Sequence, residues 1–141
     1  MVVKIKKLVE NAVIPKYSKK GDAGMDLTAV SYELDTNGNI VYGTGLAIEI
    51  PEGYVGLLFP RSSNSKTNLY LTNHVGVIDS GFRGQIMLKY KCVESYGRNV
   101  YNIGDRVGQL IILPYPSIEF EEVGELTETE RGTGGYGSTG S

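Results

Sequence analysis

The feature that most constrains the fold of this chain is a succession of short strand-like runs with almost no helical periodicity. Leu46, Ile48 and Ile50 alternate with Ala47 and Glu49, which is the two-residue period of a strand with one buried face. Similar β-branched or aliphatic runs cover residues 2–6, 55–59, 86–90 and 107–113. The pattern therefore predicts an all-β chain.

Residues that favour turns separate these runs. Residues 35–39 read Asp-Thr-Asn-Gly-Asn and predict a hairpin with Asn37 and Gly38 at its tip. Many short strands at regular spacing are typical of a sandwich, a jelly roll or a barrel. At most a short helical segment is expected after Pro60, because Ser, Asn and Thr dominate the sequence that follows. Further turns are predicted at residues 51–53, 96–99 and 103–105.

Size and composition indicate one soluble globular domain. The chain has 141 residues, enough for a single core, and 40% of them are hydrophobic. No run approaches the length of a membrane span, and the N-terminus has no apolar segment of the signal-peptide kind. A single cysteine, Cys92, excludes an internal disulfide framework and suits a reducing cytoplasm. A net charge of −2 argues against a broad nucleic-acid-binding surface, although a local nucleotide site remains possible.

The C-terminal residues 131–141 differ in kind from residues 1–130, which we expect to form the core. Five of these 11 residues are glycine, and most of the others are small or hydroxylated. Such a segment buries too little apolar surface to repay its ordering entropy, which favours a flexible tail. The alternative is a mobile lid that orders over a ligand, because Arg131, Tyr136, Ser138 and Thr139 supply a cation, a ring and two hydroxyls.

Four further segments place polar residues beside strand-like runs: residues 22–27, 60–63, 76–84 and 104–110. In the second segment a guanidinium and two hydroxyls follow an apolar strand, a combination that suits phosphate. The third places Asp79 after two aliphatic residues, with an aromatic ring three residues later. Taken singly, each segment has a plain structural explanation as a turn cap, a helix cap, a turn carboxylate or a surface ion pair.

Taken together with the tail, the segments resemble in order and spacing the five motifs of the trimeric dUTP pyrophosphatases, from Ala23 to Gly140. The resemblance implies a single-domain, jelly-roll-like β-barrel (a β-clip fold) and a homotrimer whose active sites draw on all three subunits. It implies hydrolysis of dUTP to dUMP and pyrophosphate, which keeps uracil out of DNA and supplies dUMP for thymidylate synthesis. The protein would work in the cytoplasm, or in a host's cytoplasm if it is viral.

The resemblance assigns the reacting end of the substrate to the third segment. Asp79 matches the general base, which activates a water for attack on the α-phosphorus and also reads the 3′-hydroxyl of the sugar. Asn73 and the main chain of residues 71–76 would recognise uracil, and Val77 belongs to the same substrate-binding set. Phe82 would pack on the sugar and exclude a 2′-hydroxyl.

The phosphates are assigned to three other places in the chain. Ser62 and Ser63 match phosphate contacts, and Arg61 would hold that loop or help bind the triphosphate. Gln109 matches a phosphate or water contact, and Asp26 belongs to the network around metal-bound waters. The closing contacts would come from the tail, through Arg131 at the γ-phosphate, Tyr136 on uracil, and Ser138 and Thr139 on the phosphates, with Gly137 in the same substrate-binding set.

The resemblance also implies Mg²⁺ as the cofactor, carried by the triphosphate and its waters without a direct protein ligand. His74 is then a loop residue near the uracil hairpin, and Cys92 a small buried filler.

The chain departs from the family pattern in four places. Phe82 stands where tyrosine is usual and Tyr136 where phenylalanine is usual, and both keep the ring. Residues 63–65, Ser-Asn-Ser, replace the usual Gly-Leu and a small residue, a change that bears on the phosphate loop or the trimer centre. Gly81 stands where an acidic residue is frequent.

Two other functions compete with dUTP hydrolysis as interpretations of this sequence. The related dCTP deaminases share the fold, and residues 78–82 resemble their Ile-Asp-Pro-Gly-aromatic run. Deamination needs a proton shuttle beside the amine, and Lys89 stands where the deaminases have a glutamate. Their arginine after the paired serines is also missing, with Lys66 the nearest cation. The third reading is a barrel that binds nucleotide or a partner protein without catalysis.

Overall fold

The computed structural model describes residues 1–93 and 99–140. Its strands are β1 (Lys4–Lys7), β2 (Met25–Thr28), β3 (Ser31–Leu34), β4 (Ile40–Gly43), β5 (Leu46–Glu49), β6 (Tyr54–Phe59), β7 (Leu69–Leu71), β8 (Gly76–Ile78), β9 (Met87–Cys92) and β10 (Arg106–Pro114). One short 3₁₀ helix, η1 (Ser62–Lys66), is the helical segment expected after Pro60. No helix in the described ranges has the length and apolar content needed to cross a membrane.

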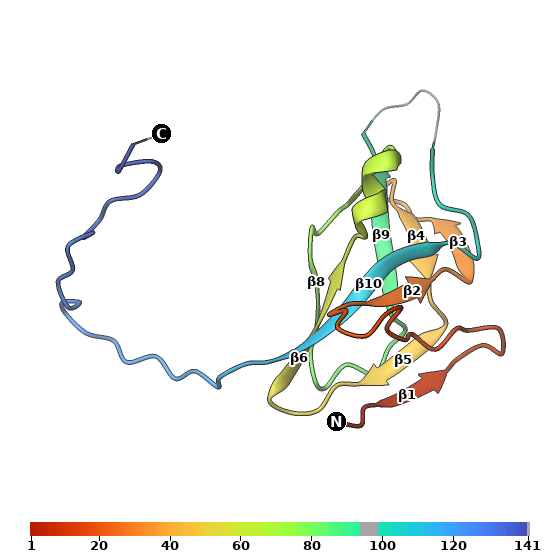
Figure 1. The fold of residues 1–141 in the computed structure, drawn as a ribbon, viewed down its shortest axis with the longest axis horizontal. Coiled ribbons are helices and arrows are strands. Elements are labelled where there is room, and N and C mark those ends of the chain that lie inside the picture. The colour runs from red at the N-terminus through yellow and green to blue at the C-terminus, as the bar shows by residue number, and fades with distance from the viewer. Residues whose placement is uncertain (94–98, 141) are drawn as a thin grey trace.

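The strands form three antiparallel sheets, in the orders β1-β5, β2-β10-β6-β8 and β3-β4-β9-β7. This arrangement confirms the all-β, jelly-roll-like prediction, although the described strands do not hydrogen-bond into one closed barrel. The ribbon in Figure 1 shows β1 and β5 at one end of the body, with η1 at the other. The predicted turn at residues 96–99 lies, for residues 96–98, outside the described part of the chain.

The core lies where the inward faces of the two four-stranded sheets meet. Leu27, Leu58 and Leu110 come from one sheet, and Tyr42 and Tyr90 come from the other, all at most 4% exposed. This is the alternation of inward and outward residues that a two-layer β structure requires. Burial raises the pKa of both tyrosine hydroxyls.

The sheets approach each other closely at β10. A Cβ added to Gly108 would lie 2.4 Å from Cδ2 of Leu88 on β9, so a side chain at this position would collide with the opposite sheet. Glycine therefore permits β10 to pass directly over the core, and β10 is the strand that carries Gln109.

The hairpin between β3 and β4 confirms the turn predicted at residues 35–39. The Asp35 carboxylate accepts hydrogen bonds from the main-chain N–H groups of Asn37 (2.9 Å) and Asn39 (2.8 Å), and Gly38 has a φ of 80°. These local bonds, with one from the side chain of Asn39 as the largest contribution, lower the pKa of Asp35 to about 2.

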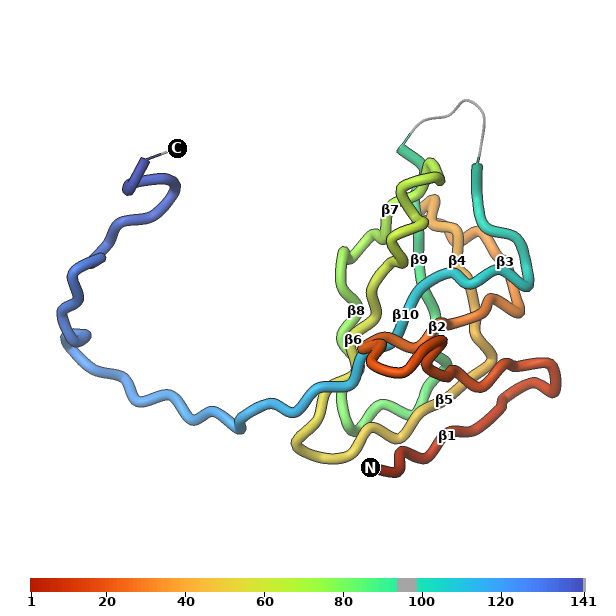
Figure 2. The backbone as a smooth tube through the Cα atoms, in the orientation of Figure 1, coloured from red at the N-terminus to blue at the C-terminus, as the bar shows by residue number. Residues whose placement is uncertain are grey.

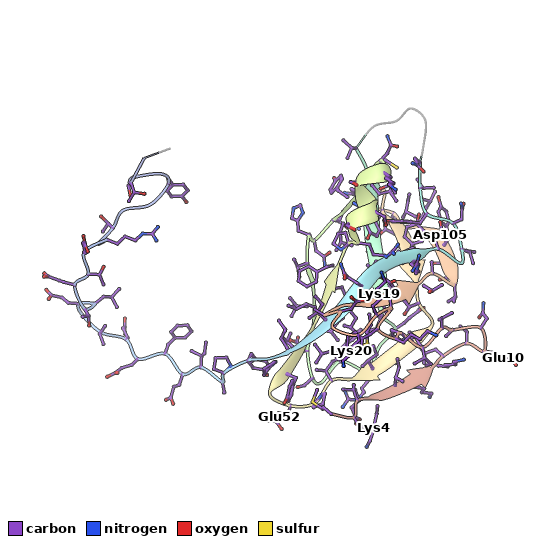
Figure 3. All side chains as sticks on the ribbon, viewed as in Figure 1. Lys4, Glu10, Lys19, Lys20, Glu52 and Asp105 are labelled. Carbon is purple, nitrogen blue, oxygen red and sulfur yellow. The ribbon has the colours of Figure 1, made fainter. Side chains whose placement is uncertain are left out.

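The chain leaves the body after β10. Figure 2 shows the C-terminal segment running away from the sheets, and its side chains in Figure 3 stand apart from them. All residues from 115 to 133 are exposed, and Phe120 and Leu126 are 94% and 86% exposed. The packed body thus ends at β10, and the expected division into residues 1–130 and 131–141 stays a prediction.

Candidate active site

An apolar cavity of about 380 Å³ opens between β6, β8, β9 and the β7–β8 hairpin. Leu58, Leu71, Ile78, Phe82 and Leu88 form its apolar wall. Gly76 keeps β8 close to β6, because a Cβ there would lie 3.1 Å from the side chain of Leu58. The cavity also has polar lining from Thr72, Asn73, Gln85 and Lys89.

Asp79 and Phe82 stand at the two ends of a tight turn after β8. The Phe82 N–H donates to the Asp79 carbonyl at 3.1 Å, and the Asp79 carboxylate is exposed beside the cavity wall. The Phe82 ring lies over Gly84, where an added Cβ would be 2.6 Å from Cζ of the ring. A carboxylate and a ring that lines the cavity are thus set a few residues apart by one short turn.

Arg83 braces this turn, a role that the sequence analysis did not predict. Its Nη1 donates to the carbonyls of Ser80 (2.7 Å) and Phe82 (3.2 Å), and its Nη2 lies 3.3 Å from a carboxylate oxygen of Glu49. The sequence shows a cation directly after the aromatic residue, but it does not show that this cation pairs with Glu49, 34 positions earlier.

The hairpin between β7 and β8 turns tightly at His74. The His74 N–H donates to the Leu71 carbonyl at 2.9 Å, and His74 has a φ of 62° in the left-handed region. Asn73 lines the apolar cavity, whereas the Val77 side chain is 62% exposed and lies outside the cavity lining. The predicted substrate contact of Val77 therefore stays a prediction.

A second, polar cavity of about 360 Å³ is lined by residues of β2 and β10 and by the segments before β2 and after β6. The strand register creates it, because β10 places Gln109 opposite Asp26 of β2 and opposite Phe59 of β6. The residues that follow β6 therefore come next to Asp26. Asp26, Arg61, Ser62, Arg106 and Gln109 line this cavity.

Asp26 is the centre of the charges in the polar cavity. Nε of Arg61 donates to one of its carboxylate oxygens at 2.9 Å, and Nη1 of Arg106 donates to the other at 3.3 Å. The guanidinium of Arg61 also donates to Oγ of Ser63 at 3.1 Å. Asp26 thus orients two guanidinium groups, a structural role that the sequence analysis did not assign to it.

The side chain of Gln109 contacts two segments that are distant in the sequence, at Pro60 and at Gly24. Its Nε2 donates to the carbonyl of Pro60 at 3.0 Å. Its Oε1 rests against Gly24, where an added Cβ would lie only 2.2 Å away. A side chain at position 24 would therefore collide with the amide of Gln109.

No group of three or more His, Cys, Asp or Glu side chains that could hold a metal ion occurs among residues 1–93 and 99–140. The carboxylate of the polar cavity already has two cationic partners. Cys92 is partly buried and packs against the core. The expectation that Mg²⁺ arrives with the triphosphate, without a direct protein ligand, stays a prediction.

The predicted site residues fall into three separate groups. Asn73 and Phe82 line the apolar cavity, with Asp79 beside it, whereas Arg61, Ser62 and Gln109 line the polar cavity. The two cavities have no lining residue in common. The tail residues form the third group. Nε of Arg131 donates to the Gly134 carbonyl within the tail at 2.9 Å, and Tyr136 is fully exposed.

Comparison with known proteins identifies the family. The dUTPase family model matches residues 10–140. Deoxyuridine 5′-triphosphate nucleotidohydrolase of Corynebacterium glutamicum is 39% identical over 140 residues, covering 98% of this chain and 94% of the relative. The enzyme of the same name from Cutibacterium acnes is 40% identical over 129 residues, covering 90% of this chain and 85% of the relative.

Two similar solved structures are also dUTPases. The dUTPase of Staphylococcus bacteriophage 80alpha with dUpNHpp has a TM-score of 0.81 and 31% identity, covering 99% of both chains. A mutant dUTPase from phage phi11 of S. aureus, described for its coordination of a structural Mg(II) ion, has a TM-score of 0.73 and 31% identity, covering 89% of this chain and 98% of that one. The fold, the length and the ordered motifs thus agree, and the chain belongs to the dUTPase family of nucleotide-hydrolysing enzymes.

Proposed function

We propose that the chain hydrolyses dUTP to dUMP and pyrophosphate by attack of water on the α-phosphorus. The observation that carries this proposal is the exposed carboxylate of Asp79 beside an apolar cavity walled by Phe82. The cavity volume of about 380 Å³ lies in the usual range for small-molecule sites. In this proposal the nucleoside occupies the cavity and its α-phosphate lies near the carboxylate.

In the proposed reaction, Asp79 accepts a proton from a water molecule while the oxygen of that water bonds to the α-phosphorus. The bond between that phosphorus and the bridging oxygen breaks, and pyrophosphate leaves on the opposite side. Such a displacement requires mainly positioning and charge neutralisation. The substrate is the magnesium complex of dUTP, whose ion neutralises part of the phosphate charge. Arg61, Ser62 and Ser63 bind the phosphates, and Gln109 binds a phosphate oxygen or a water.

Selectivity for uracil rests on Asn73 and on the main chain of the β7–β8 hairpin. Cytosine presents the reverse donor and acceptor pattern at its pairing edge, so it would leave buried polar groups without partners. Phe82 packs on the deoxyribose and leaves no room for a 2′-hydroxyl. In the cell, this selectivity would keep uracil out of DNA and supply dUMP for thymidylate synthesis.

The complete site belongs to a homotrimer in this proposal. The separation of the apolar and polar cavities within one chain supports it, because a triphosphate on the nucleoside then meets the polar cavity of a neighbouring copy. The exposed tail reaches across in the same way, bringing Arg131 and Tyr136 over the substrate, followed by Gly137, Ser138 and Thr139.

Mixing two inactive variants tests the shared site. A chain with Asp79→Asn keeps its tail, and a chain without residues 131–141 keeps its carboxylate. After subunit exchange, which native mass spectrometry verifies, the mixture should regain activity because some sites combine an intact carboxylate with a neighbour's tail. Exchanged mixtures that stay inactive at every ratio would contradict shared sites.

The reaction itself is tested with dUTP, dCTP, dTTP and UTP at equal concentration with Mg²⁺ in ¹⁸O-labelled water. We expect pyrophosphate from dUTP only, with the label in dUMP, because the water oxygen joins the α-phosphorus. Label in pyrophosphate would place the attack at the β-phosphorus. Ammonia from dCTP would indicate a deaminase, and no product from any nucleotide would favour a binding protein.

A further inference from the structure

The helix η1, which begins with Ser62, has little apolar packing to hold it. None of its residues is buried, and its N-terminal cap, Arg61, makes no capping hydrogen bond through its side chain. A five-residue 3₁₀ helix is not stable by itself. Its position must therefore come from polar contacts with the rest of the body.

Asn64 provides these contacts from the middle of η1. Its Nδ2 donates to the Leu69 carbonyl at 3.0 Å, and its Oδ1 accepts from the hydroxyls of Tyr101 (3.0 Å) and Thr67 (3.2 Å). The Asn64 main-chain carbonyl also accepts from the Thr67 N–H at 3.0 Å. One side chain thus joins η1, β7 and the segment before β10.

Tyr101 gives Asn64 a rigid partner. It is 7% exposed and meets Tyr42 and Tyr90 edge to face, with ring centroids 5.8 Å and 5.6 Å apart. Its carbonyl accepts a hydrogen bond from the Tyr42 hydroxyl at 2.8 Å. The Tyr101 hydroxyl is therefore fixed by the core before it reaches the loop.

The loop that carries Arg61, Ser62 and Ser63 is thus attached at both ends. At its start, the guanidinium of Arg61 binds Asp26 of β2. Further along, Asn64 binds Tyr101. Burial raises the pKa of Tyr101, with the positive charge of Arg61 opposing that rise, so the hydroxyl keeps the proton that it donates to Asn64.

We propose that Asn64 and Tyr101 are positioning residues, which hold the Arg61–Ser62–Ser63 loop in the geometry that binds the triphosphate. The inference rests on the proposed function of that loop. By the resemblance, the family has leucine at the position of Asn64, so this hydrogen bond to Tyr101 is not part of the family pattern. Neither residue lines the polar or the apolar cavity, so neither is a catalytic residue.

The test compares Tyr101→Phe with Tyr90→Phe. Both variants lose one hydroxyl from the same aromatic cluster, but the Tyr90 hydroxyl donates to the Val107 carbonyl at 2.6 Å and does not contact η1. Two ligands are used: the non-hydrolysable triphosphate dUpNHpp and deoxyuridine, which has no phosphate. Calorimetry gives the Kd of the triphosphate, and inhibition kinetics give the constant for deoxyuridine.

We expect Tyr101→Phe to weaken dUpNHpp binding about threefold to tenfold, the effect of one net hydrogen bond, and to leave deoxyuridine binding unchanged. Tyr90→Phe should leave both constants unchanged, even if it lowers the melting temperature as much. Equal weakening of both ligands in Tyr101→Phe, or no weakening at all, would overturn the inference.

A second variant approaches the same contact from the loop. Asn64→Leu leaves the buried Tyr101 hydroxyl without its acceptor and should weaken dUpNHpp binding. The double variant Asn64→Leu, Tyr101→Phe restores an apolar contact and should recover part of that affinity, whereas additive losses would contradict the coupling. A wild-type chain that failed to bind dUpNHpp would overturn the proposed function as well, whereas variants identical to a binding wild type would overturn this inference alone.

Discussion

Gly84→Ala tests whether the Phe82 ring sets the selectivity for deoxyribose. The added Cβ would lie 2.6 Å from Cζ and 2.9 Å from Cε1 of that ring, where ordinary contacts are 3.4–4 Å. The ring must therefore move by about 1 Å or turn into solvent. Displacements of this order cost up to about 100-fold in turnover at a reacting centre.

The cost to stability should be small, because Phe82 is already 43% exposed. Full burial of a phenylalanine side chain is worth about 1.5–3 kcal/mol, so losing the remaining half costs on the order of 1 kcal/mol. Loss of the wall against the 2′-hydroxyl should lower the ratio of kcat/KM for dUTP to that for UTP about tenfold.

Steady-state kinetics with dUTP and UTP measure this ratio, and urea unfolding measures stability. Gly81→Ala is the matched control, because no atom lies within 4 Å of its added Cβ and its φ is not in the left-handed region. The control should stay within about twofold of wild type, the scatter expected for surface substitutions. A Gly84→Ala enzyme that folds normally and keeps the wild-type ratio would refute the role of Phe82.

Three further variants test other parts of the account. Deleting residues 131–141 should abolish most activity without lowering the melting temperature, since the tail contributes nothing to the packed body; early unfolding would contradict the lid. Gly24→Ala should displace Gln109 and break its bond to the Pro60 carbonyl, so KM for dUTP should rise, and unchanged kinetics would count against Gln109. Asp35→Asn should remove an acid-dependent part of stability. Because the pKa of Asp35 is lowered from 3.8 to about 2 in the fold, its contribution is complete above about pH 4 and is lost as the pH falls toward 2. Urea midpoints from pH 5 to 2 should therefore fall less steeply in the variant, and parallel curves would contradict this assignment.

The sequence predicted those parts of the fold that depend on neighbouring residues. Alternation at residues 46–50 corresponds to β5, and the turn residues at 35–39 form the β3–β4 hairpin. The run at residues 2–6 appears later, as β1, because it pairs with β5 only from Lys4 onward. The periodicity did not predict β7 and β8, since three residues are too few to show a two-residue period, although the resemblance implied the hairpin between them.

The parts that the sequence did not predict depend on contacts between distant residues. Asp26 is paired with Arg61 and Arg106 because of the register between β2, β10 and β6. The hydrogen bond between Asn64 and Tyr101 joins residues 37 positions apart, and no local sequence pattern predicts it. The roles of the predicted site residues stay predictions, and the separation of the two cavities could not be foreseen from the order of the motifs.

A paired measurement on Asp79→Asn decides whether this carboxylate acts as the general base. Single-turnover hydrolysis of dUTP and the Kd of dUpNHpp are measured on the same preparation of the wild-type and variant proteins. If Asp79 is the general base, hydrolysis should fall by about 100-fold to 10,000-fold while the Kd changes by only a few fold. A variant that still hydrolyses dUTP at the wild-type rate would contradict the account.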